Sequence, residues 1–537
     1  MGTLVLGGLN TYSGGTFISA GTLSVSVLNN TGSAGNLGTG STISIGTGAT
    51  AGALTYTGTG ETTDRILNLA GDTGGATITQ SGVSGNLKFT RDVIASGAGA
   101  KTLTLSGSTA GTGEIAGAIV DNSATGATAL TKTGTGIWTL SGNNTYSGAT
   151  TLTGTSGILS LTHANALGAT TAGTTQSGAS ELRISGGITL AAEPISINGG
   201  GINNAGALRN FADNNTYTGT LTLAGQSRIV SDSGTLTMNA ANAVTGATNL
   251  IISGAGNINI AGAITIGAGF IAKDALIGNG TGTLTFGGAN TYTGATTVGA
   301  GTLRLDYSAN DNSKLSDTAA LVFGTATGGT PIGTVVTGGT VELAGGTHAE
   351  VVGSTTLTAN TPASTISRSS GNSVLNLNFI TPNTGTGLIF TAPNIATSDN
   401  GTVNGILGFW ARMNVGGVST WATSDGLDDS PIRAFAGYTD INRLGGSVPN
   451  VEASHVRIVN GGTSGDITLS GGAFTQAYTL QMDATDGRAT IRPTANTDVL
   501  NIGDEIGGAI WQTANAGGLT VVPRHVVRSF GEPGARR

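Results

Sequence analysis

Short segments in which an aliphatic residue alternates with a polar one recur along almost the whole chain. Residues 101–105 read Lys-Thr-Leu-Thr-Leu, residues 234–238 Gly-Thr-Leu-Thr-Met and residues 257–260 Asn-Ile-Asn-Ile. This period of two predicts half-buried β-strands. Gly and Asn interrupt the pattern every few residues, as tight turns require, and we find no apolar pattern with the 3.6-residue period of a helix.

One five-residue motif, Asn-Thr-Tyr-(Ser/Thr)-Gly, occurs four times, and its flanks repeat as well. An apolar strand precedes it at 2–6, 136–140 and 282–286, and an Ala-Gly-Thr-Leu segment follows it at 20–23 and 300–303. The spacing between copies is irregular, which predicts degenerate repeats between them. We interpret the motif positions as structural, and they are Asn10, Tyr12, Gly14, Asn144, Tyr146, Gly148, Asn215, Tyr217, Gly219, Asn290, Tyr292 and Gly294.

Short strands, frequent turns and a repeating unit predict an all-β chain folded as a β-solenoid, in particular a parallel β-helix. With coils of roughly 20 residues, the chain has room for about 25 of them. Leu303 and Leu305 are expected to face inward, and Thr302 and Arg304 outward. Threonine suits the outer face, because it is β-branched and can form hydrogen-bonded ladders between coils.

The alternative fold is an array of antiparallel β-sandwiches. Such an array requires hairpin turns of the Asn-Gly or Asp-Gly kind between strands of regular length. The pairs at 279–280 and 486–487 are of this kind, but they do not recur in step with the repeat. The repeat evidence therefore favours the solenoid.

The composition suggests one long repetitive body rather than several ordinary domains. We expect a solenoid with repeat motifs at 1–310, a degenerate continuation at 311–400, an aromatic-richer insert or irregular coils at 401–445, further β-coils at 446–520 and a basic, non-repetitive tail at 521–537.

Composition also removes several classes of protein. Gly accounts for 93 of 537 residues without a three-residue period, which excludes collagen. Charged residues make up only 9% of the chain and there is no cysteine, which excludes charge-driven disorder, disulfide scaffolds and cysteine chemistry. The net charge of −7 argues against a nucleic-acid partner. No apolar run is long enough for a transmembrane helix, and we expect neither a transmembrane segment nor a signal peptide in this chain.

The unit at 282–305 resembles the autotransporter-associated β-strand repeat of large bacterial surface and secreted proteins. The segments at 2–25, 136–161 and 215–230 are similar, with decreasing fidelity, and the resemblance extends over most of residues 1–520. It implies a β-helical passenger that reaches the cell surface or is secreted, exported across the outer membrane in a longer precursor. The chain begins inside a repeat and ends in an Arg-rich stretch at 523–537, which suggests a passenger fragment with a truncated or frameshifted end.

The sequence contains no catalytic, cofactor-binding or metal-binding constellation that we would assign. Phosphate-binding loops and a serine-hydrolase elbow are absent, and the four histidines are far apart. Two groups of residues have the carboxylates that glycosidases need, although solvated turns explain them better. They are Glu61, Asp64 and Arg65, and Glu342, His348 and Glu350. The acidic loop with Asp425, Asp428 and Asp429 lacks the spacing of an EF-hand.

Aromatic residues suggest two further possibilities. The motif tyrosines either stack on sugar rings or pack over turns with their hydroxyls bonded, and we favour the second. A second grouping falls in the least repetitive part of the chain, where it indicates a local thickening of the solenoid or, alternatively, a binding surface. Its members are Phe409, Trp410, Trp421, Phe435 and Tyr438.

These observations lead to a functional hypothesis of a bacterial surface or secreted passenger that is structural and adhesive and performs no catalysis. Its expected partners are a surface polysaccharide or a matrix protein, with no nucleic acid and no cofactor, and open coil ends predict end-to-end self-association. The alternatives are a spacer that binds nothing and carries a missing module, and a polysaccharide-active enzyme on a β-helix.

Overall fold

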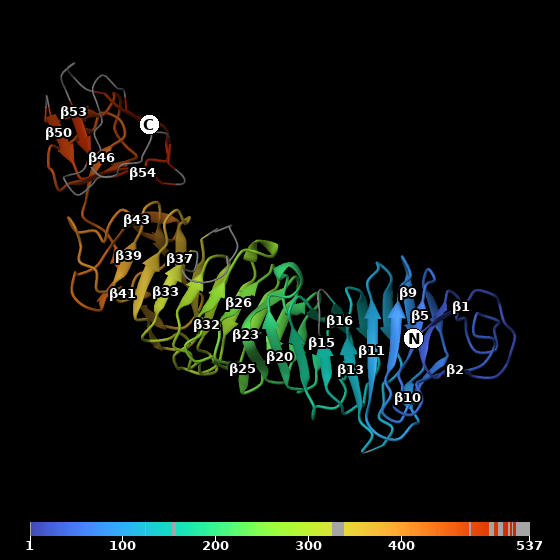
Figure 1. Ribbon diagram of the computed structural model, residues 1–537. Helices are drawn as coiled ribbons and strands as arrows, with labels where there is room; N and C mark the ends of the chain where they lie inside the picture. The colour runs from blue at the N-terminus through green and yellow to red at the C-terminus, as the bar shows by residue number, and fades with distance from the viewer. Residues whose placement is uncertain are drawn as a thin grey trace. The chain divides into compact units, whose positions relative to one another are not determined.

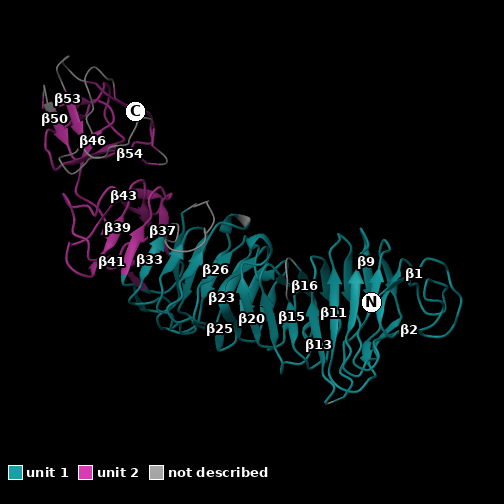
Figure 2. Cartoon of the chain, viewed as in Figure 1, with its two compact units in different colours: residues 1–353, 369–373 teal, residues 354–368, 374–537 magenta. Residues whose placement is uncertain are grey.

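The computed structural model describes nearly all of the chain and divides it into two compact units. The described residues are 2–123, 125–152, 157–324, 338–471, 474–492, 499–502, 509–513, 516–517 and 519–521. Unit 1 comprises residues 1–353 and 369–373, and unit 2 comprises residues 354–368 and 374–537 (Figure 2). Most of the predicted tail, residues 522–537, lies outside the described residues.

Both units consist of short strands that stack in parallel, one coil upon the next (Figure 1). The only helical elements among the described residues are two 3₁₀ turns, Ile202–Asn204 and Gly278–Gly280. The predicted all-β solenoid is therefore confirmed, and the parallel pairing excludes the sandwich array as the architecture of the main body. No helix of the described residues is long and apolar enough to cross a membrane.

In unit 1 the strands form three ladders, each a series in which a strand pairs in parallel with the strand one coil further on. The first ladder contains β1 (Thr3–Leu6), β3 (Gly21–Val25), β5 (Gly52–Tyr56), β8 (Ala76–Gln80), β11 (Lys101–Gly107), β13 (Thr128–Lys132), β15 (Thr150–Leu152), β17 (Thr174–Ser177), β20 (Ile195–Gly199), the start of β23 (Leu221–Ser231), β25 (Asn242–Gly246) and β28 (Ala263–Thr265).

The second ladder runs along a neighbouring side of unit 1 and shares β23 with the first. It contains β6 (Glu61–Thr63), β9 (Asn86–Phe89), β12 (Thr112–Ile115), β14 (Ile137–Leu140), β16 (Ile158–Leu161), β18 (Glu181–Ile184), β21 (Leu208–Asn210), the end of β23, β26 (Leu250–Ser253), β29 (Ile271–Lys273), β31 (Thr296–Val298) and β33 (Ala320–Phe323).

The third ladder is interrupted between β10 and β19. It contains β2 (Thr16–Ile18), β4 (Thr42–Ile45), β7 (Ile66–Leu69) and β10 (Val93–Ala95), and then β19 (Thr189–Leu190), β22 (Asn215–Tyr217), β24 (Thr235–Met238), β27 (Asn257–Ile260), β30 (Thr283–Phe286), β32 (Thr302–Asp306) and β34 (Thr340–Ala344). Unit 1 also includes β35 (Ala349–Val351), which belongs to none of the three ladders.

Stacked aliphatic side chains fill the interior of the coils. Leu303 and Leu305 of β32 are buried and Thr302 and Arg304 are partly exposed, as the alternation predicts. Leu303 lies in register with Leu284 of the preceding coil. Such rows remove methyl groups from water at every coil, which explains how a chain with few aromatic residues forms a continuous core.

The length of a coil varies more than the sequence suggests. Where a motif lies within a coil, the step is close to the expected 20 residues, as from Thr283 to Thr302. Other coils are longer, and Gly21 pairs with Gly52, 31 residues later. Extra residues in the turns leave the strands in register, because loops lie outside the ladders. The described part of the chain therefore forms about 18 turns, fewer than the roughly 25 that the sequence predicts for the chain.

In unit 2 the parallel stacking stops at a hairpin and then resumes. Strands β42 (Ala411–Val415) and β43 (Val418–Thr423) pair in antiparallel fashion around Gly416 and Gly417, which both have positive φ, as a two-residue hairpin turn requires. The earlier strands are β36 (Ser354–Leu357), β37 (Ser364–Arg368), β38 (Val374–Asn376), β39 (Ile380–Pro382), β40 (Leu388–Phe390) and β41 (Ala396–Ser398), and β44 (Ser430–Pro431) and β45 (Arg433–Ala434) are also antiparallel to their partners.

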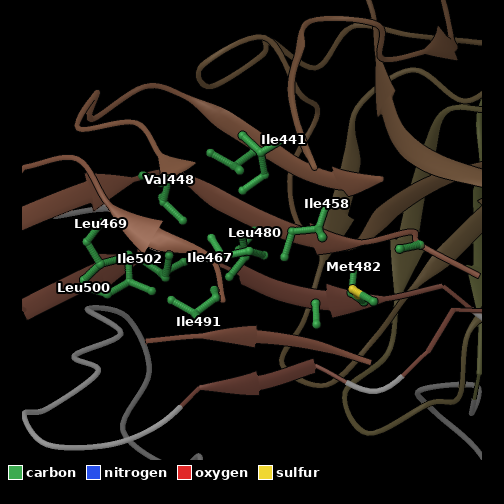
Figure 3. Close-up of a cluster of buried hydrophobic side chains, with 14 residues drawn as sticks. Ile441, Val448, Ile458, Ile467, Leu469, Leu480, Met482, Ile491, Leu500 and Ile502 are labelled. Atoms are coloured by element: carbon green, nitrogen blue, oxygen red, sulfur yellow. The ribbon is translucent and has the colours of Figure 1, made fainter. Parts of the chain in front are cut away.

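The last coils of unit 2 have a core of their own. Ile441, Ile458, Leu480 and Met482 are among fourteen buried residues that face one another there (Figure 3). The strands are β46 (Tyr438–Asn442), β47 (Ser447–Val448), β48 (His455–Val459), β49 (Thr468–Leu469), β50 (Phe474–Ala477), β51 (Thr479–Met482), β52 (Ala489–Ile491), β53 (Val499–Ile502), β54 (Ala509–Gln512) and β55 (Leu519–Val521), and their pairings are parallel.

Candidate functional site: the stacked repeat motif and the remaining polar clusters

The asparagine of the repeat motif lies inside the solenoid and connects successive coils. The Ile119 N–H donates to Asn144 Oδ1 at 2.8 Å, and Asn144 Nδ2 donates to the Ala166 carbonyl at 2.6 Å. Ile119 precedes Asn144 by 25 residues and Ala166 follows it by 22, so the amide joins three consecutive coils. Asparagine is suited to this position because its short side chain carries both an acceptor and a donor.

The fourth copy of the motif repeats this geometry. The Ile264 N–H donates to Asn290 Oδ1 at 2.9 Å, and Asn290 Nδ2 donates to the Lys314 carbonyl at 2.8 Å. In the third copy Asn215 accepts from the Ile188 N–H at 2.8 Å, but its Nδ2 donates within its own coil, to Asn210 Oδ1. The backbone bond from the preceding coil is therefore common to the three copies.

Three of the four motif tyrosines, Tyr146, Tyr217 and Tyr292, pack beneath the turns with their hydroxyls bonded. Tyr146 and Tyr292 are buried, and each hydroxyl lies 2.6 Å from the Oγ1 of the threonine four residues later, Thr150 or Thr296. Tyr217 is also buried, and its hydroxyl donates to the Glu193 carbonyl at 2.6 Å. Burial raises the pKa of these phenols, so they remain protonated at neutral pH. Rings in this position are not available to stack on a sugar.

The motif glycine lies against the backbone of the preceding coil. A Cβ atom added to Gly148, Gly219 or Gly294 would lie 2.5, 2.5 or 2.3 Å from a backbone oxygen of that coil. None of the three has the positive φ that favours glycine, so the close approach of the two coils accounts for the residue. In the first copy Gly14 has no such neighbour, and Tyr12 is 43% exposed.

Glu193 is a buried carboxylate that the sequence did not single out. Its Oε1 accepts from Thr174 Oγ1 at 2.6 Å, and its Oε2 has no hydrogen-bond partner among the described residues. Desolvation raises its pKa to about 7, which the hydrogen bond from Thr174 only partly offsets. Folding therefore favours the protonated form of this group.

We expect the Glu193→Gln variant to lose a pH dependence of stability that the wild type shows between pH 5 and 8. Because the folded pKa is raised above the ordinary value, the contribution of Glu193 is fully present below about pH 4.5 and is lost as the pH rises through about 7. The free energy of unfolding should fall by at most about 3 kcal/mol across this range in the wild type. Urea denaturation at a series of pH values measures this difference.

Glu114→Gln is the matched control, because hydrogen bonds from Lys88, Ser141 and Asn86 lower the pKa of Glu114 despite its partial burial. The contribution of Glu114 to the free energy of unfolding is present above its unfolded pKa, and it is lost only as the pH falls through the lowered folded pKa. An unchanged pH profile in Glu193→Gln would show that this carboxyl is ionised at neutral pH in the folded protein.

The first predicted group of carboxylates holds a turn of the solenoid. Glu61 accepts from the N–H groups of Leu28 and Asn29 at 2.7 and 2.9 Å, and Asp64 accepts from the Thr31 N–H at 2.7 Å. The buried Arg65 donates to several carbonyls of the turn, including Gly38 at 2.6 Å. These bonds use the groups within the fold, so the trio does not converge on an open groove.

The second predicted group is divided between the surface and the interior. Glu342 pairs with Arg304 across neighbouring strands at 3.1 Å. Glu350 is buried, where it accepts from the Tyr307 hydroxyl at 2.6 Å and from the N–H groups of Lys314 and Leu315. His348 stacks on the Tyr307 ring with centroids 5.2 Å apart. Each carboxylate therefore has a separate structural role.

The acidic loop in unit 2 forms ordinary polar contacts. Asp425 pairs with Arg433 at 2.6 Å, and Asp429 accepts from Asn376 Nδ2. Within the described part of the chain, no group of three or more His, Cys, Asp or Glu residues is arranged to hold a metal ion.

The structure brings four of the five predicted aromatic residues of unit 2 together. Phe409, Trp421, Phe435 and Tyr438 form one cluster, and Trp410 instead lines a cavity of about 190 Å³. The sequence did not identify the other members, His455, Tyr478 and Trp511, because they are distant in the chain and no local pattern marks them.

His455 connects this cluster to the backbone. Its Nε2 lies 2.7 Å from the Asn404 carbonyl and its Nδ1 lies 3.0 Å from Thr479 Oγ1, while burial lowers its pKa. The ring is therefore neutral near pH 7 and joins the segment around the hairpin to the coils that follow. This arrangement supports a packing role for most of the aromatic residues.

Comparison with known proteins identifies the repeat. Residues 1–25, 130–155 and 276–305 match the passenger-associated-transport-repeat family, and these segments contain the first, second and fourth copies of the motif. The adhesin BmaC autotransporter of Brucella suis biovar 1 (strain 1330) is 38% identical over 132 residues, which are 24% of this chain and 4% of that protein. The chain thus spans only a small part of the length of this relative. No solved structure matches the chain.

Proposed function

We propose that this chain, three segments of which match the passenger-associated-transport-repeat family, is part of an autotransporter passenger that is exported in a longer precursor to the bacterial surface or secreted, where it serves as a structural and adhesive scaffold without catalysis. The observation that carries this proposal is that the side chains able to bind a ligand or perform chemistry form hydrogen bonds within the fold instead. The motif amides, the motif phenols and both predicted carboxylate groups bond within or between coils. Outer side chains then remain as the surface that a partner meets.

The adhesive part of the proposal has a second support. The relative described above is named an adhesin, and it is 38% identical to this chain over 132 residues. A solenoid presents similar side chains at every coil, so weak contacts add along its length when a partner is itself extended. A surface polysaccharide and a matrix protein are both partners of this kind. End-to-end association of two chains stays a prediction.

The full chain should bind at least one extended surface component and release no product from it. The measurement is a pull-down of the purified 537-residue chain against a panel of polysaccharides and matrix proteins, with an assay for new reducing ends in the same samples. The same chain after thermal denaturation is the control for binding that does not need the fold. New reducing ends would overturn the proposal in favour of an enzyme, and the absence of all binding would favour a spacer.

A further inference from the structure

A single row of hydroxyl side chains runs along the outer face of the first ladder. Each residue of the row lies in direct register with the next, one coil further on, although the intervening chain varies in length. The row contains one threonine or serine from each of nine consecutive coils. Its members are Thr77, Thr104, Thr131, Thr151, Thr175, Ser196, Thr222, Thr245 and Thr265.

Most of these hydroxyls are not used by the protein. Thr222 and Thr245 lie 3.2 Å apart through their Oγ1 atoms, and Thr265 donates to the Val244 carbonyl at 3.4 Å. In the part of the chain that the structure describes, the other six hydroxyls have no protein hydrogen-bond partner. The row therefore differs from the buried motif threonines Thr150 and Thr296, which bond tyrosine.

The chemistry around the row is uniformly neutral. Its outward neighbours on the same strands carry only hydroxyl, amide or methyl groups; they are Thr79, Thr102, Ser106, Ala129, Ser177, Asn198, Ala224 and Ala263. The corresponding row of the second ladder is charged, since Lys88 pairs with Glu114 at 2.8 Å and Arg183 lies beside Arg209. Charge is thus placed on a different ladder of the same unit.

These features select among the possible partners. A face without cations does not attract nucleic acid or an acidic polymer. Protein interfaces gain most of their affinity from aromatic residues and arginine, and neither the row nor its outward neighbours on the same strands include such a residue. A hydroxyl both donates and accepts, and so does each hydroxyl of a sugar. Neighbouring strands are about 4.8 Å apart, a spacing of the same order as one sugar unit.

We propose that this row, from Thr77 to Thr265, binds a neutral, extended polysaccharide that lies along the solenoid axis. The inference rests on the proposed adhesive function and names its partner. Each hydroxyl pair contributes a small part of the affinity, and the contributions add because successive sugars meet successive coils. Affinity therefore depends on the number of coils in contact rather than on one pocket.

A recess opens beside the row at the coil of Ser196. Asn198, two residues later on β20 and on the same face, lines a cavity of about 380 Å³ together with Asn204, Gln226 and Arg228. Arg228 Nη1 is bonded to Asp274 at 2.9 Å, so its charge is paired. The lining offers amide groups, which also pair with sugar hydroxyls, and gives room for a branch on the polymer.

The test removes four adjacent hydroxyls in the full chain by combining Thr104→Val, Thr131→Val, Thr151→Val and Thr175→Val. Valine keeps the β-branched shape and the strand preference of threonine, so the fold is retained. The matched control combines four outward threonines of the other two ladders, Thr139→Val, Thr216→Val, Thr237→Val and Thr285→Val. Circular dichroism and thermal unfolding check that both variants fold as the wild type does.

Binding is measured to immobilised dextran, mannan and β-1,3-glucan, with heparin as a charged comparator. We expect the wild type to bind at least one neutral polymer, the variant of the row to lose about tenfold or more in apparent affinity, and the control to remain within about twofold. The apparent affinity should also change little with added salt, because neither the row nor the polymer contributes a charged group to the contact.

Equal binding by the row variant and the wild type would overturn the inference. If the wild type binds a matrix protein but none of the neutral polymers, the inference fails and the adhesive function stands. If the wild type binds neither class, both proposals fail.

Discussion

Replacing Asn144 by alanine should lower the free energy of unfolding by about 4 kcal/mol. The substitution leaves the Ile119 N–H without its acceptor and the Ala166 carbonyl without its donor, both in the interior of the solenoid. A buried polar group without a partner costs about 1–3 kcal/mol, and two such groups are created here. Urea denaturation followed by circular dichroism measures the loss, and amide hydrogen exchange at Ile119 locates it.

The neighbouring residue provides the control. Asn143 is exposed, and its Oδ1 accepts a hydrogen bond from Asn165 Nδ2 at 2.8 Å on the surface. Asn143→Ala should therefore change stability by no more than about 0.5 kcal/mol. Equal stability of the two variants would mean that the buried amide does not hold the coils together. A third variant, Asn144→Asp, keeps the acceptor for Ile119 but loses the donor to Ala166, and we expect it to be destabilised as well.

Gly294→Ala should destabilise the protein by about 3 kcal/mol or more, although it adds only one methyl group. The new Cβ would lie 2.3 Å from the Gly269 oxygen and 2.7 Å from the Ala268 oxygen. Both atoms belong to the backbone of the preceding coil, so no side chain can move aside and the coils must separate. Because each coil contacts only its neighbours, protection against hydrogen exchange should fall on both sides of the substitution. Mass spectrometry of exchanged peptides resolves this pattern.

The same position of the motif in its first copy is the matched control. Nothing lies within 4 Å of a Cβ added to Gly14, and its φ is not in the left-handed region. Gly14→Ala should therefore be neutral or stabilise the protein by up to about 1 kcal/mol, because alanine restricts the unfolded chain. A similar loss in Gly14→Ala and Gly294→Ala would contradict the role of coil contact.

Much of the repeat motif's structure could be predicted from the local sequence. The recurrence of the motif predicted a repeating coil, and the strands that flank the motif do pair with each other, as Leu284 does with Leu303. The preference for a bonded tyrosine over an exposed one also agrees with Tyr146 and Tyr292. The sequence did not reveal that the motif asparagine connects three coils, because its partners lie more than twenty residues away in both directions.

The contacts and burial of the polar clusters could not be predicted from the local sequence. Glu61, Asp64 and Arg65 are adjacent in the sequence, but their partners belong to a turn of the preceding coil. The burial of Glu193 is not predictable from the local sequence, since nothing near it in the chain marks it as buried. The hairpin at Gly416 and Gly417 interrupts the parallel stack. Gly-Gly pairs are frequent in this chain, so this pair did not by itself predict a hairpin. For Glu61, Asp64 and Glu193, the environment is supplied by a neighbouring coil.

The sequence by itself determined the secondary structure, the repeat and the inward-facing residues, because alternation, turn residues and strand preference are local properties. The tertiary structure alone decided the register of the coils. Turns of different length separate Thr131, Thr151 and Thr175, yet the three lie side by side. Register follows from the packing of aliphatic side chains and from backbone bonds between coils, and it places one hydroxyl beside the next on the outer face.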